Sequence, residues 1–435
     1  MPIPSSSPLD RSLGMLVYAS TISGIGGRIR SAFEDFIVEE LAEPGVLIEG
    51  PSQGDYVLAL IEKRGMDTFK AALKLAERLR IPLSYVTYAG LKDASAVTVQ
   101  RFSIKGLRPE ALEGLSIPGL RVLRSHSYHK PLARGELYGN RFTVTIREVR
   151  LSLGEALSRV RAIMASLLKL NGFPNFYGYQ RFGTRRPNTH VVGKLMLLRR
   201  YEEAVREFLF HAYPGESEQA RKARMVGDYR LALKLMPKTL LYERRMLKYL
   251  INHPNDYLGA LKSLPRPLLR LMVEAFQAYI FNKALSLRIE ELADSYHLPF
   301  EGDFLIVAKG GLMKVKEVNE ALNLIKESRA SLVLPLPSYE LAIRGDDYIP
   351  RHLKRALDDE GISLKDFKVD FMPGIKLPLR FRSVTSKPKG FTVVNVLQEP
   401  SSCTLTFRFT LERGVYATSL LRELMKPEDP LNAGF

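Results

Sequence analysis

The segment Gly90–Lys105 of this 435-residue chain carries side chains suited to acid–base or nucleophilic chemistry. Two runs rich in β-branched and aromatic residues flank its polar part, Tyr85–Tyr88 before it and Phe102–Ile104 at its end. The pattern predicts a strand, a turn and a second strand, with Lys92 and Asp93 at the turn, where a side chain can face a cleft. Asp93 alternatively hydrogen-bonds only its own turn, as aspartate often does. The spacing alone favours that second interpretation, so the rest of the chain must decide.

A second candidate feature is the strand predicted over Tyr138–Arg147, where side chains alternate between two faces. The alternation places Asn140 beside Phe142 on the apolar face. An amide seldom occupies such a face unless it has a hydrogen-bond partner, or lies at an edge or strand end. Both explanations remain open. The apolar face comprises Asn140, Phe142, Val144 and Ile146, and the other face comprises Arg141, Thr143, Thr145 and Arg147.

Other common chemistries find little support in the sequence. His126 and His129 are three residues apart, but nothing supplies a convincing third ligand, so no metal site is predicted. There is no phosphate-binding loop or dinucleotide fingerprint, and the Gly24–Gly27 cluster does not open a helix. The remaining groups suit cofactor-free chemistry on a flipped base. An aromatic ring would stack on the base, an amide would read its edge, and a carboxylate would act at the sugar.

The charge balance indicates a polyanionic partner. The chain has 64 Lys and Arg against 47 Asp and Glu, a net charge of +17 and a pI near 9.7. About half of this excess lies in residues 181–250, which contain 16 basic and 7 acidic residues. Such a field favours RNA or DNA through phosphate neutralisation. The alternative is the solvated face of an arginine-rich protein.

Length and composition set further bounds. A chain of 435 residues with 46% hydrophobic residues predicts more than one domain with well-buried cores. No apolar run approaches 18 residues, and residues 1–13 lack an apolar signal-peptide core. The single cysteine, Cys403, excludes an internal disulfide framework and a multi-cysteine zinc site. These features fit a reducing cytoplasm.

The periodicity of the first 172 residues mixes strands and helices. Asp35–Glu39 and Asp55–Ile61 are predicted strands, and residues 67–80 carry a helical apolar stripe. Ser152 and Glu155 form a capping box for a helix that stops near Asn171.

Beyond Gly172 the pattern changes. An aromatic, glycine-punctuated segment at 173–183 is predicted to be irregular, and residues 192–292 to be mostly helical. Short strands and a basic loop at 380–389 follow. A strand over Cys403–Leu411 then leads to a last helix capped by Thr418 or Ser419.

Five segments in this order resemble the TruD family of tRNA pseudouridine synthases, and together they span nearly the whole chain. Each alone carries little weight, but five in the family's order are specific. The segments are Phe33–Glu40, Gly90–Gln100, Gly139–Phe142, Asn175–Gly183 and Gly414–Leu424.

The resemblance implies an α+β fold. Its core would be a mixed or antiparallel pseudouridine-synthase sheet with flanking helices, and a family-specific α/β insertion would contribute RNA binding. The implied domains are residues 1–174 with 390–435 for catalysis and residues 175–389 for the insertion. The implied partner is tRNA, with no cofactor, no metal, no membrane and no obligate protein partner, and with the chain a monomer.

The resemblance also implies site residues. Asp93 matches the catalytic aspartate, and Arg30 and Lys92 match basic support for it. Three departures accompany this match: Ala94 where a basic residue often follows, Tyr179 where an acidic residue is common, and Tyr416 where some members have Phe. The implied base or RNA contacts are Phe36, Asn140, Phe142, Tyr416, Gln180 and Arg181.

The implied reaction converts uridine to pseudouridine in tRNA. The C1′–N1 bond breaks, the uracil turns within its pocket, and C5 joins C1′. Asp93 either attacks C1′ or removes a proton from C2′, and the sequence does not separate these. The competing interpretations are a non-catalytic RNA-binding protein or chaperone on the same fold, and an RNA glycosidase that releases uracil. The family points to position 13 of tRNA as the target.

Overall fold

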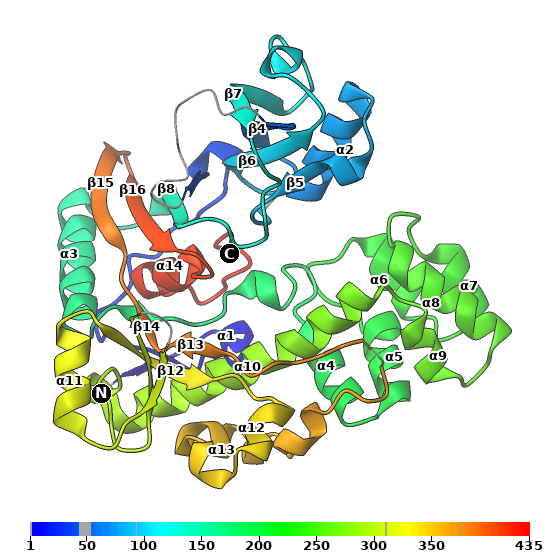
Figure 1. Cartoon of the computed structure of the whole chain (residues 1–435). Helices are drawn as coiled ribbons and strands as arrows, with labels where there is room; N and C mark the ends of the chain where they lie inside the picture. The colour runs from blue at the N-terminus through cyan, green and yellow to red at the C-terminus, as the bar shows by residue number, and fades with distance from the viewer. Residues whose placement is uncertain (1, 43–53, 93, 309–310, 373) are drawn as a thin grey trace. The chain divides into compact units, whose positions relative to one another are not determined.

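The computed structural model of the chain describes residues 2–42, 54–92, 94–308, 311–372 and 374–435 (Figure 1). The described chain forms two compact units. The first, here called the sheet unit, comprises residues 23–162, 387–417 and 432–435. The second, the helical unit, comprises residues 1–22, 163–386 and 418–431. Within the described ranges, no helix is both long enough and apolar enough to span a bilayer.

The sheet unit is built on one mixed sheet, which confirms the predicted fold class. Its strand order within the described residues is β15-β16-β8-β3-β6-β4-β7, with β5 paired to β6. The β3–β6 pair is parallel and the other pairs are antiparallel. The strands are β3 (Phe36–Leu41), β4 (Tyr56–Arg64), β5 (Val86–Tyr88), β6 (Val97–Lys105), β7 (Leu120–Tyr128), β8 (Gly139–Val149), β15 (Lys389–Gln398) and β16 (Cys403–Glu412).

Helix α2 (Thr68–Leu79) covers one face of β4, β5 and β6 (Figure 1). It begins where predicted because the Asp67 carboxylate caps it, accepting from the Lys70 amide at 2.8 Å. Its alanine and leucine stripe packs on the buried apolar residues of the strands, and this packing forms one core of the unit. Helix α3 (Leu153–Lys169) also begins at its predicted cap, since the Ser152 hydroxyl accepts from the Glu155 amide at 3.3 Å.

One strand begins earlier than the sequence predicts. Residues 97–101 belong to β6, although the sequence reasoning placed them in a polar segment before the strand. Gln100 and Arg101 are buried because both have partners: Gln100 bonds Thr68, and Arg101 pairs with Glu40. A buried polar side chain is tolerated when it is hydrogen-bonded, so the strand continues through them.

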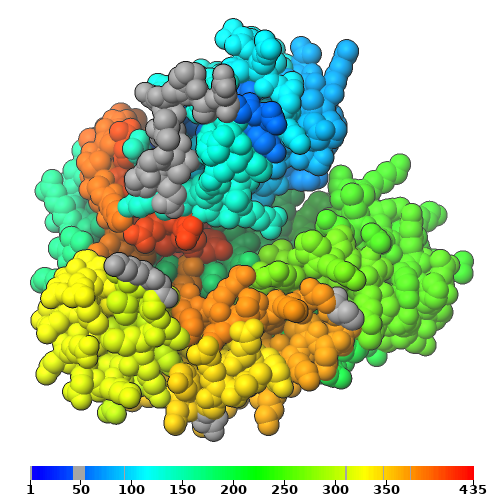
Figure 2. All heavy atoms as spheres, viewed as in Figure 1, coloured from blue at the N-terminus to red at the C-terminus, as the bar shows by residue number. Residues whose placement is uncertain are grey.

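The helical unit is organised around α10 (Arg266–Leu292), whose buried residues lie on much of its circumference. Helix α4 (Thr189–Leu197) crosses it closely, because a Cβ on Gly193 would meet the Met272 carbonyl oxygen at 2.0 Å. The predicted helical stretch over residues 192–292 is confirmed by α4 to α10, of which α5 to α9 are coloured green in Figure 2. The intervening helices are α5 (Tyr201–Phe210), α6 (Glu218–Arg224), α7 (Tyr229–Leu235), α8 (Leu241–Asn252) and α9 (Tyr257–Lys262).

The rest of the helical unit consists of short elements. A four-stranded sheet has the order β11-β10-β12-β13, and two-stranded pairs join β1 to β2 and β9 to β14. The predicted irregular segment holds only β9 and the 3₁₀ turn η4 (Tyr179–Arg181). The strands are β1 (Ile3–Pro4), β2 (Val17–Tyr18), β9 (Phe173–Pro174), β10 (Phe304–Val307), β11 (Gly311–Lys314), β12 (Ala330–Pro335), β13 (Phe381–Ser383) and β14 (Thr385–Ser386), and the helices are α1 (Pro8–Ser12), α11 (Val318–Lys326), α12 (Tyr339–Ile343), α13 (Arg351–Asp359) and α14 (Ala417–Met425).

The predicted cap of the last helix is wrong. Helix α14 begins at Ala417, so Thr418 and Ser419 both lie in its first turn. The Ser419 hydroxyl instead donates to the Phe176 carbonyl at 3.0 Å. This tertiary hydrogen bond uses the side chain that the sequence assigned to capping.

The same helix carries a buried ion pair that explains one departure from the family pattern. Arg422 donates through Nε to Asp10 Oδ2 at 2.6 Å, and the Tyr179 hydroxyl donates to Asp10 Oδ1 at 2.6 Å. Burial, together with the Asp10 carboxylate, raises the pKa of Tyr179 well above its usual value. Tyr179 is therefore a neutral, buried donor within the helical unit.

Part of the basic stretch at 181–250 is also internal. Arg224 is fully buried and pairs with Glu216 at 2.8 Å and Glu243 at 2.9 Å. Arg186 contacts the same two carboxylates, and burial lowers its pKa. Arg244 donates to two carbonyls at the end of α7, each at 2.7 Å. These arginines support the fold, so only the remaining exposed ones are available to an external polyanion.

Candidate active site

Lys92 lies at the centre of a buried polar cluster in the sheet unit. Its Nζ donates to Asn140 Oδ1 at 2.7 Å and lies 3.2 Å from Glu40 Oε2. The other carboxylate oxygen of Glu40 accepts from Arg101 Nε at 3.1 Å. Of these side chains, Lys92 is 6% exposed and Glu40 is 0% exposed. Two cations, Lys92 and Arg101, thus share the one carboxylate of Glu40.

Strand register brings the cluster together. Glu40 of β3 and Asn140 of β8 are directly opposite in the antiparallel ladder, so their side chains share a face of the sheet. Gly139 precedes Asn140 because a Cβ at that position would meet the Leu411 carbonyl oxygen at 2.2 Å. The partner that the sequence required for Asn140 is thus Lys92, and β8 is an interior strand.

Three buried side chains, those of Thr68, Gln100 and Lys63, hold the backbone of residues 90–92 by hydrogen bonds. The Lys92 amide donates to Thr68 Oγ1 at 2.8 Å, and Thr68 donates to Gln100 Oε1 at 2.9 Å. Gln100 Nε2 in turn donates to the Gly90 carbonyl at 3.2 Å, and Lys63 Nζ reaches the Lys92 carbonyl at 3.3 Å. Side chains from α2, β4 and β6 therefore hold the segment 90–92 in one conformation.

Asp93, the predicted catalytic residue, lies outside the described residues. Its role, and the alternative that it only bonds its own turn, both stay predictions. The described chain fixes the residue immediately before it, since Lys92 is bonded through its amide, its carbonyl and its side chain.

Aromatic rings lie on the same strands. Phe36 of β3 and Phe142 of β8 meet edge to face, with ring centroids 6.1 Å apart. Phe142 also stacks on Phe409 of β16 at 5.5 Å. Burial along β8 alternates as predicted, with Phe142, Val144 and Ile146 on the buried face. Phe142 is 7% exposed, so its ring is packed within this row of aromatic side chains.

Arg30 joins this row in a strained backbone conformation. Its φ of 58° lies in the left-handed region, which costs about 1–2 kcal/mol for a residue with a side chain. Its guanidinium donates to the Gly434 carbonyl at 2.9 Å and lies 4.1 Å from the centroid of the Phe36 ring. Strain of this kind is typical of functional sites. The structure thus brings Arg30, Phe36 and Phe142 together.

The remaining predicted site residues lie elsewhere in the chain. Tyr416 is half-buried in the connection between β16 and α14. Gln180 and Arg181 lie in η4 of the helical unit, where Arg181 pairs with Glu274 at 3.2 Å.

The sequence reasoning missed several members of the site. Glu40, Thr68 and Lys63 were assigned no role, and Gln100 was noted only as part of a motif. For Glu40 a signal existed, since it shares strand parity with Phe36 and Val38 on the buried face of β3. A carboxylate on such a face needs a cationic partner.

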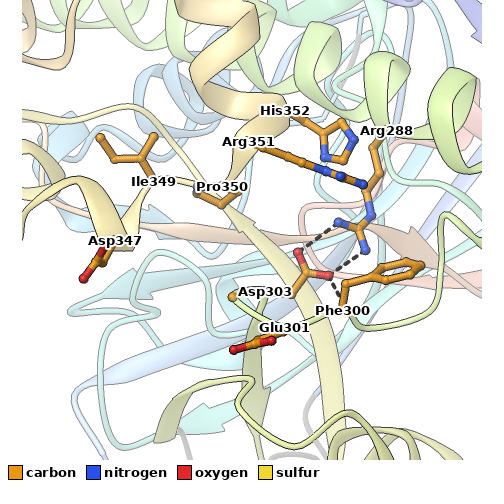
Figure 3. Close-up of a pocket in the computed structure, with 10 residues that line it drawn as sticks. Arg288, Phe300, Glu301, Asp303, Asp347, Ile349, Pro350, Arg351 and His352 are labelled. Atoms are coloured by element: carbon orange, nitrogen blue, oxygen red, sulfur yellow. Dashed lines mark hydrogen bonds and ion pairs between the residues drawn. The ribbon is translucent and has the colours of Figure 1, made fainter.

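A cavity of about 420 Å³ in the helical unit has a different character (Figure 3). Arg288 donates to both oxygens of Asp303 at 2.9 and 2.7 Å, and His352 contacts Glu291 at 3.0 Å. Burial lowers the pKa of His352 to about 4, so its ring is neutral near pH 7. These polar groups are already matched to one another, and we do not assign chemistry to this cavity.

The cluster around Lys92 defines a class of site. The hydrogen-bonded cations at Lys92 suit an ionised carboxylate beside them. The aromatic row on the neighbouring strands suits a planar, neutral ring. The cations lower the pKa of a carboxylate placed beside them, and the rings accommodate a base by stacking. Among the described residues, no three His, Cys, Asp or Glu side chains are grouped so as to hold a metal ion.

Comparison with known proteins places the chain in a family. Residues 12–424 match the family model described as tRNA pseudouridine synthase D (TruD). A protein of Methanopyrus kandleri named "Probable tRNA pseudouridine synthase D" is 37% identical over 90% of both chains. One of Thermococcus gammatolerans with the same name is 38% identical over 93% of this chain and 95% of its own.

A solved structure agrees with the sequence relatives. The crystal structure of the protein from Methanosarcina mazei titled "Putative tRNA pseudouridine synthase D (TruD)" superposes with a TM-score of 0.80 and 31% identity, covering 99% of this chain and 100% of that one. The fold and the sequence together therefore define a pseudouridine-synthase type of protein. More narrowly, the chain belongs to the TruD family.

Proposed function

We propose that this protein isomerises uridine to pseudouridine in tRNA, without a cofactor or metal. The observation that carries the proposal is the position of Lys92, which contacts Asn140 and Glu40 and immediately precedes Asp93. A purely structural turn has little need for a buried lysine shared between an amide and a carboxylate. Membership of the TruD family supports the same activity.

In this proposal Asp93 is the catalytic group, acting at C1′ or C2′ of the target nucleotide. Lys92 and Arg30 favour its ionised form, because a nearby opposite charge lowers a carboxyl pKa. The C1′–N1 bond breaks, the base turns, and C5 bonds to C1′, while N1 gains a proton and C5 loses one. The reaction is therefore a balanced isomerisation that needs no co-reactant.

Phe36, Phe142 and Tyr416 are proposed to contact the detached uracil, and Asn140 to read its edge. An apolar, aromatic lining suits this step, because the free base must stay bound while it turns. The packing of Phe142 against Phe36 and Phe409 supports a rigid stacking surface. Gln180 and Arg181 are proposed as RNA contacts.

We assign the catalytic role to residues 1–174 and 390–435 and tRNA binding to residues 175–389. The basic excess of residues 181–250 supports the second assignment. The target is proposed to be uridine 13, in the cytoplasm, with the protein acting as a monomer that has no obligate protein partner.

The test is incubation of the whole protein with unmodified tRNA transcripts, followed by carbodiimide mapping of pseudouridine and measurement of free uracil. We expect pseudouridine at one main position and no released uracil. Release of free uracil would establish a glycosidase, and binding without any change in the RNA would establish a non-catalytic RNA-binding protein. Either result would contradict the proposal. Mapping total tRNA from cells that lack the gene tests position 13 separately from the reaction.

A further inference from the structure

A small arginine-lined cavity is formed entirely by residues of the helical unit. It has a volume of about 130 Å³ and is formed by residues near η4, α10 and β13. Three arginines line it, together with the carboxylate of Glu274 and the ring of Tyr177. Its apolar wall includes Leu336, Leu377, Pro378 and Phe381. We refer to it as the arginine cavity.

The carboxylate of Glu274 in the arginine cavity is shared among several arginines. Glu274 accepts from Arg181 at 3.2 Å and from Arg270 at 2.9 Å, and lies 4.0 Å from Arg380. Burial alone would raise the pKa of Glu274, but the hydrogen bonds and charges of Arg270 and Arg181 lower it overall, so it stays ionised. Three guanidinium groups, those of Arg181, Arg270 and Arg380, thus share the one carboxylate of Glu274.

Two arginines that line the cavity are held in place on one aromatic ring. Arg382 donates through Nε to the Asn175 carbonyl at 2.8 Å and through NH2 to the Asn175 side chain at 2.6 Å. Its guanidinium lies 4.1 Å from the centroid of the Tyr177 ring, and that of Arg181 lies 5.8 Å from it. Prearranged guanidinium groups recognise phosphate well, because little side-chain freedom is lost on binding.

Arg181 carries a buried donor that the described residues leave unsatisfied. Its Nε is buried and has no hydrogen-bond partner among them. A buried donor without an acceptor is unfavourable, and an anion in the cavity would supply the acceptor. The size of the cavity narrows the choice of anion. Pockets for whole ligands usually exceed about 300 Å³, so this cavity suits a phosphate group and not a nucleoside.

We propose that the arginine cavity binds a phosphodiester group of the RNA backbone. The inference rests on the proposed function, since it makes the cavity a contact for the tRNA substrate. Phosphate contacts of this kind position an RNA without reading its sequence. The cavity thus adds Arg380 and Arg382 to the RNA contacts and explains why Glu274 is shared among several arginines.

The test compares Arg380→Gln with Arg329→Gln in the full chain. Arg380 has a 57% exposed side chain and only a loose pair with Glu274, so its replacement should leave the fold intact. Arg329 is the matched control: its side chain is 64% exposed, it pairs with Glu327, and it undergoes the same change of charge. Unmodified tRNA transcripts are titrated at several salt concentrations.

Arg380→Gln should weaken tRNA binding several-fold and reduce the slope of log affinity against log salt by about 1, as expected for one lost phosphate contact. Arg329→Gln should change neither. Equal slopes for the two variants would overturn the proposal. A second result would also overturn it: inorganic phosphate stabilises the natural chain but not Arg380→Gln, while tRNA binding is the same for both. The cavity would then bind free phosphate and not the RNA. Binding is measured without chemistry, so this outcome is independent of whether uridine is isomerised.

Discussion

Lys92 Nζ donates to Asn140 Oδ1 at 2.7 Å near the start of strand β8, and the backbone amide of Lys92 donates to Thr68 Oγ1. One residue thus links the candidate catalytic loop to the strand that carries the aromatic row. The segment that ends at Lys92 therefore lies beside the strand that carries Phe142.

The carboxylate of Glu40 is expected to hold this site together. Glu40→Gln keeps the shape of the side chain but leaves Lys92 and Arg101 without their anion. Breaking a buried ion pair in this way costs about 3–5 kcal/mol, so the free energy of unfolding measured in urea should fall by roughly that amount. Turnover should fall as well.

Glu39→Gln is the matched control for that change. Glu39 is the neighbouring residue, is 40% exposed, and reaches Arg141 only at 3.7 Å. We expect a change within about 0.5 kcal/mol, as is usual for a surface substitution. Equal losses in the free energy of unfolding for Glu40→Gln and Glu39→Gln would show that the ion pairs of Glu40 stabilise the fold no more than a surface residue does.

Phe142 is expected to have two roles, packing and base stacking. Phe142→Leu preserves most of the volume, so the stability cost should stay below about 1.5 kcal/mol. Loss of a stacked base should cost about 1–3 kcal/mol in kcat/KM. Phe391→Leu is the control, because Phe391 stacks on Phe409 but is assigned no substrate contact. If Phe142→Leu and Phe391→Leu are equally active when folded, Phe142 serves only the core.

Variants of two neighbouring arginines in α8 should distinguish a role in stability from a role in RNA binding. Arg244 bonds two backbone carbonyls, so Arg244→Gln should cost about 1–3 kcal/mol of stability. Arg245 is exposed, so Arg245→Gln should leave stability within about 0.5 kcal/mol. Because Arg245 belongs to the basic stretch, its loss should reduce the slope of log affinity for tRNA against log salt by about 1. An unchanged slope would make Arg245 part of a solvated face.

Stability should fall in mild acid because of His190. Burial among Phe182 and Tyr279 lowers the pKa of His190 to about 4. Between pH 6.5 and 4 the unfolded chain therefore binds a proton that the folded chain does not, so stability rises with pH through this window. At about 1.4 kcal/mol per pKa unit the contribution reaches roughly 3 kcal/mol.

His190→Phe keeps an aromatic ring at the position but removes the titration. Urea unfolding at pH 7 and pH 4.5 should show a smaller acid-induced loss in the variant than in the natural chain. An identical loss in the two proteins would mean that His190 is protonated in the folded state at pH 4.5.

The sequence predicted the local elements of the site better than its contacts. Parity along β8 placed Phe142 on the buried face, an apolar stripe located α2, and a capping box placed the start of α3. These follow from residues close in the chain. The Glu40 cluster depends on β3 pairing in parallel with β6 and antiparallel with β8, which no local pattern specifies.

Other differences have the same origin. Tyr179 occupies a family position where an acidic residue is common, and no local pattern indicated that it would bond Asp10, 169 positions away. The internal roles of Arg186 and Arg244 were likewise invisible in the charge count, because composition does not distinguish a buried guanidinium from an exposed one.

The central claim is that Asp93 performs the isomerisation. Asp93→Asn keeps the shape of the side chain and removes its charge, and pseudouridine in unmodified tRNA is mapped by carbodiimide labelling alongside tRNA affinity. We predict that no pseudouridine forms, while binding changes by less than about 1 kcal/mol, since binding and chemistry are separable. Substantial pseudouridine formation by this variant would contradict the account.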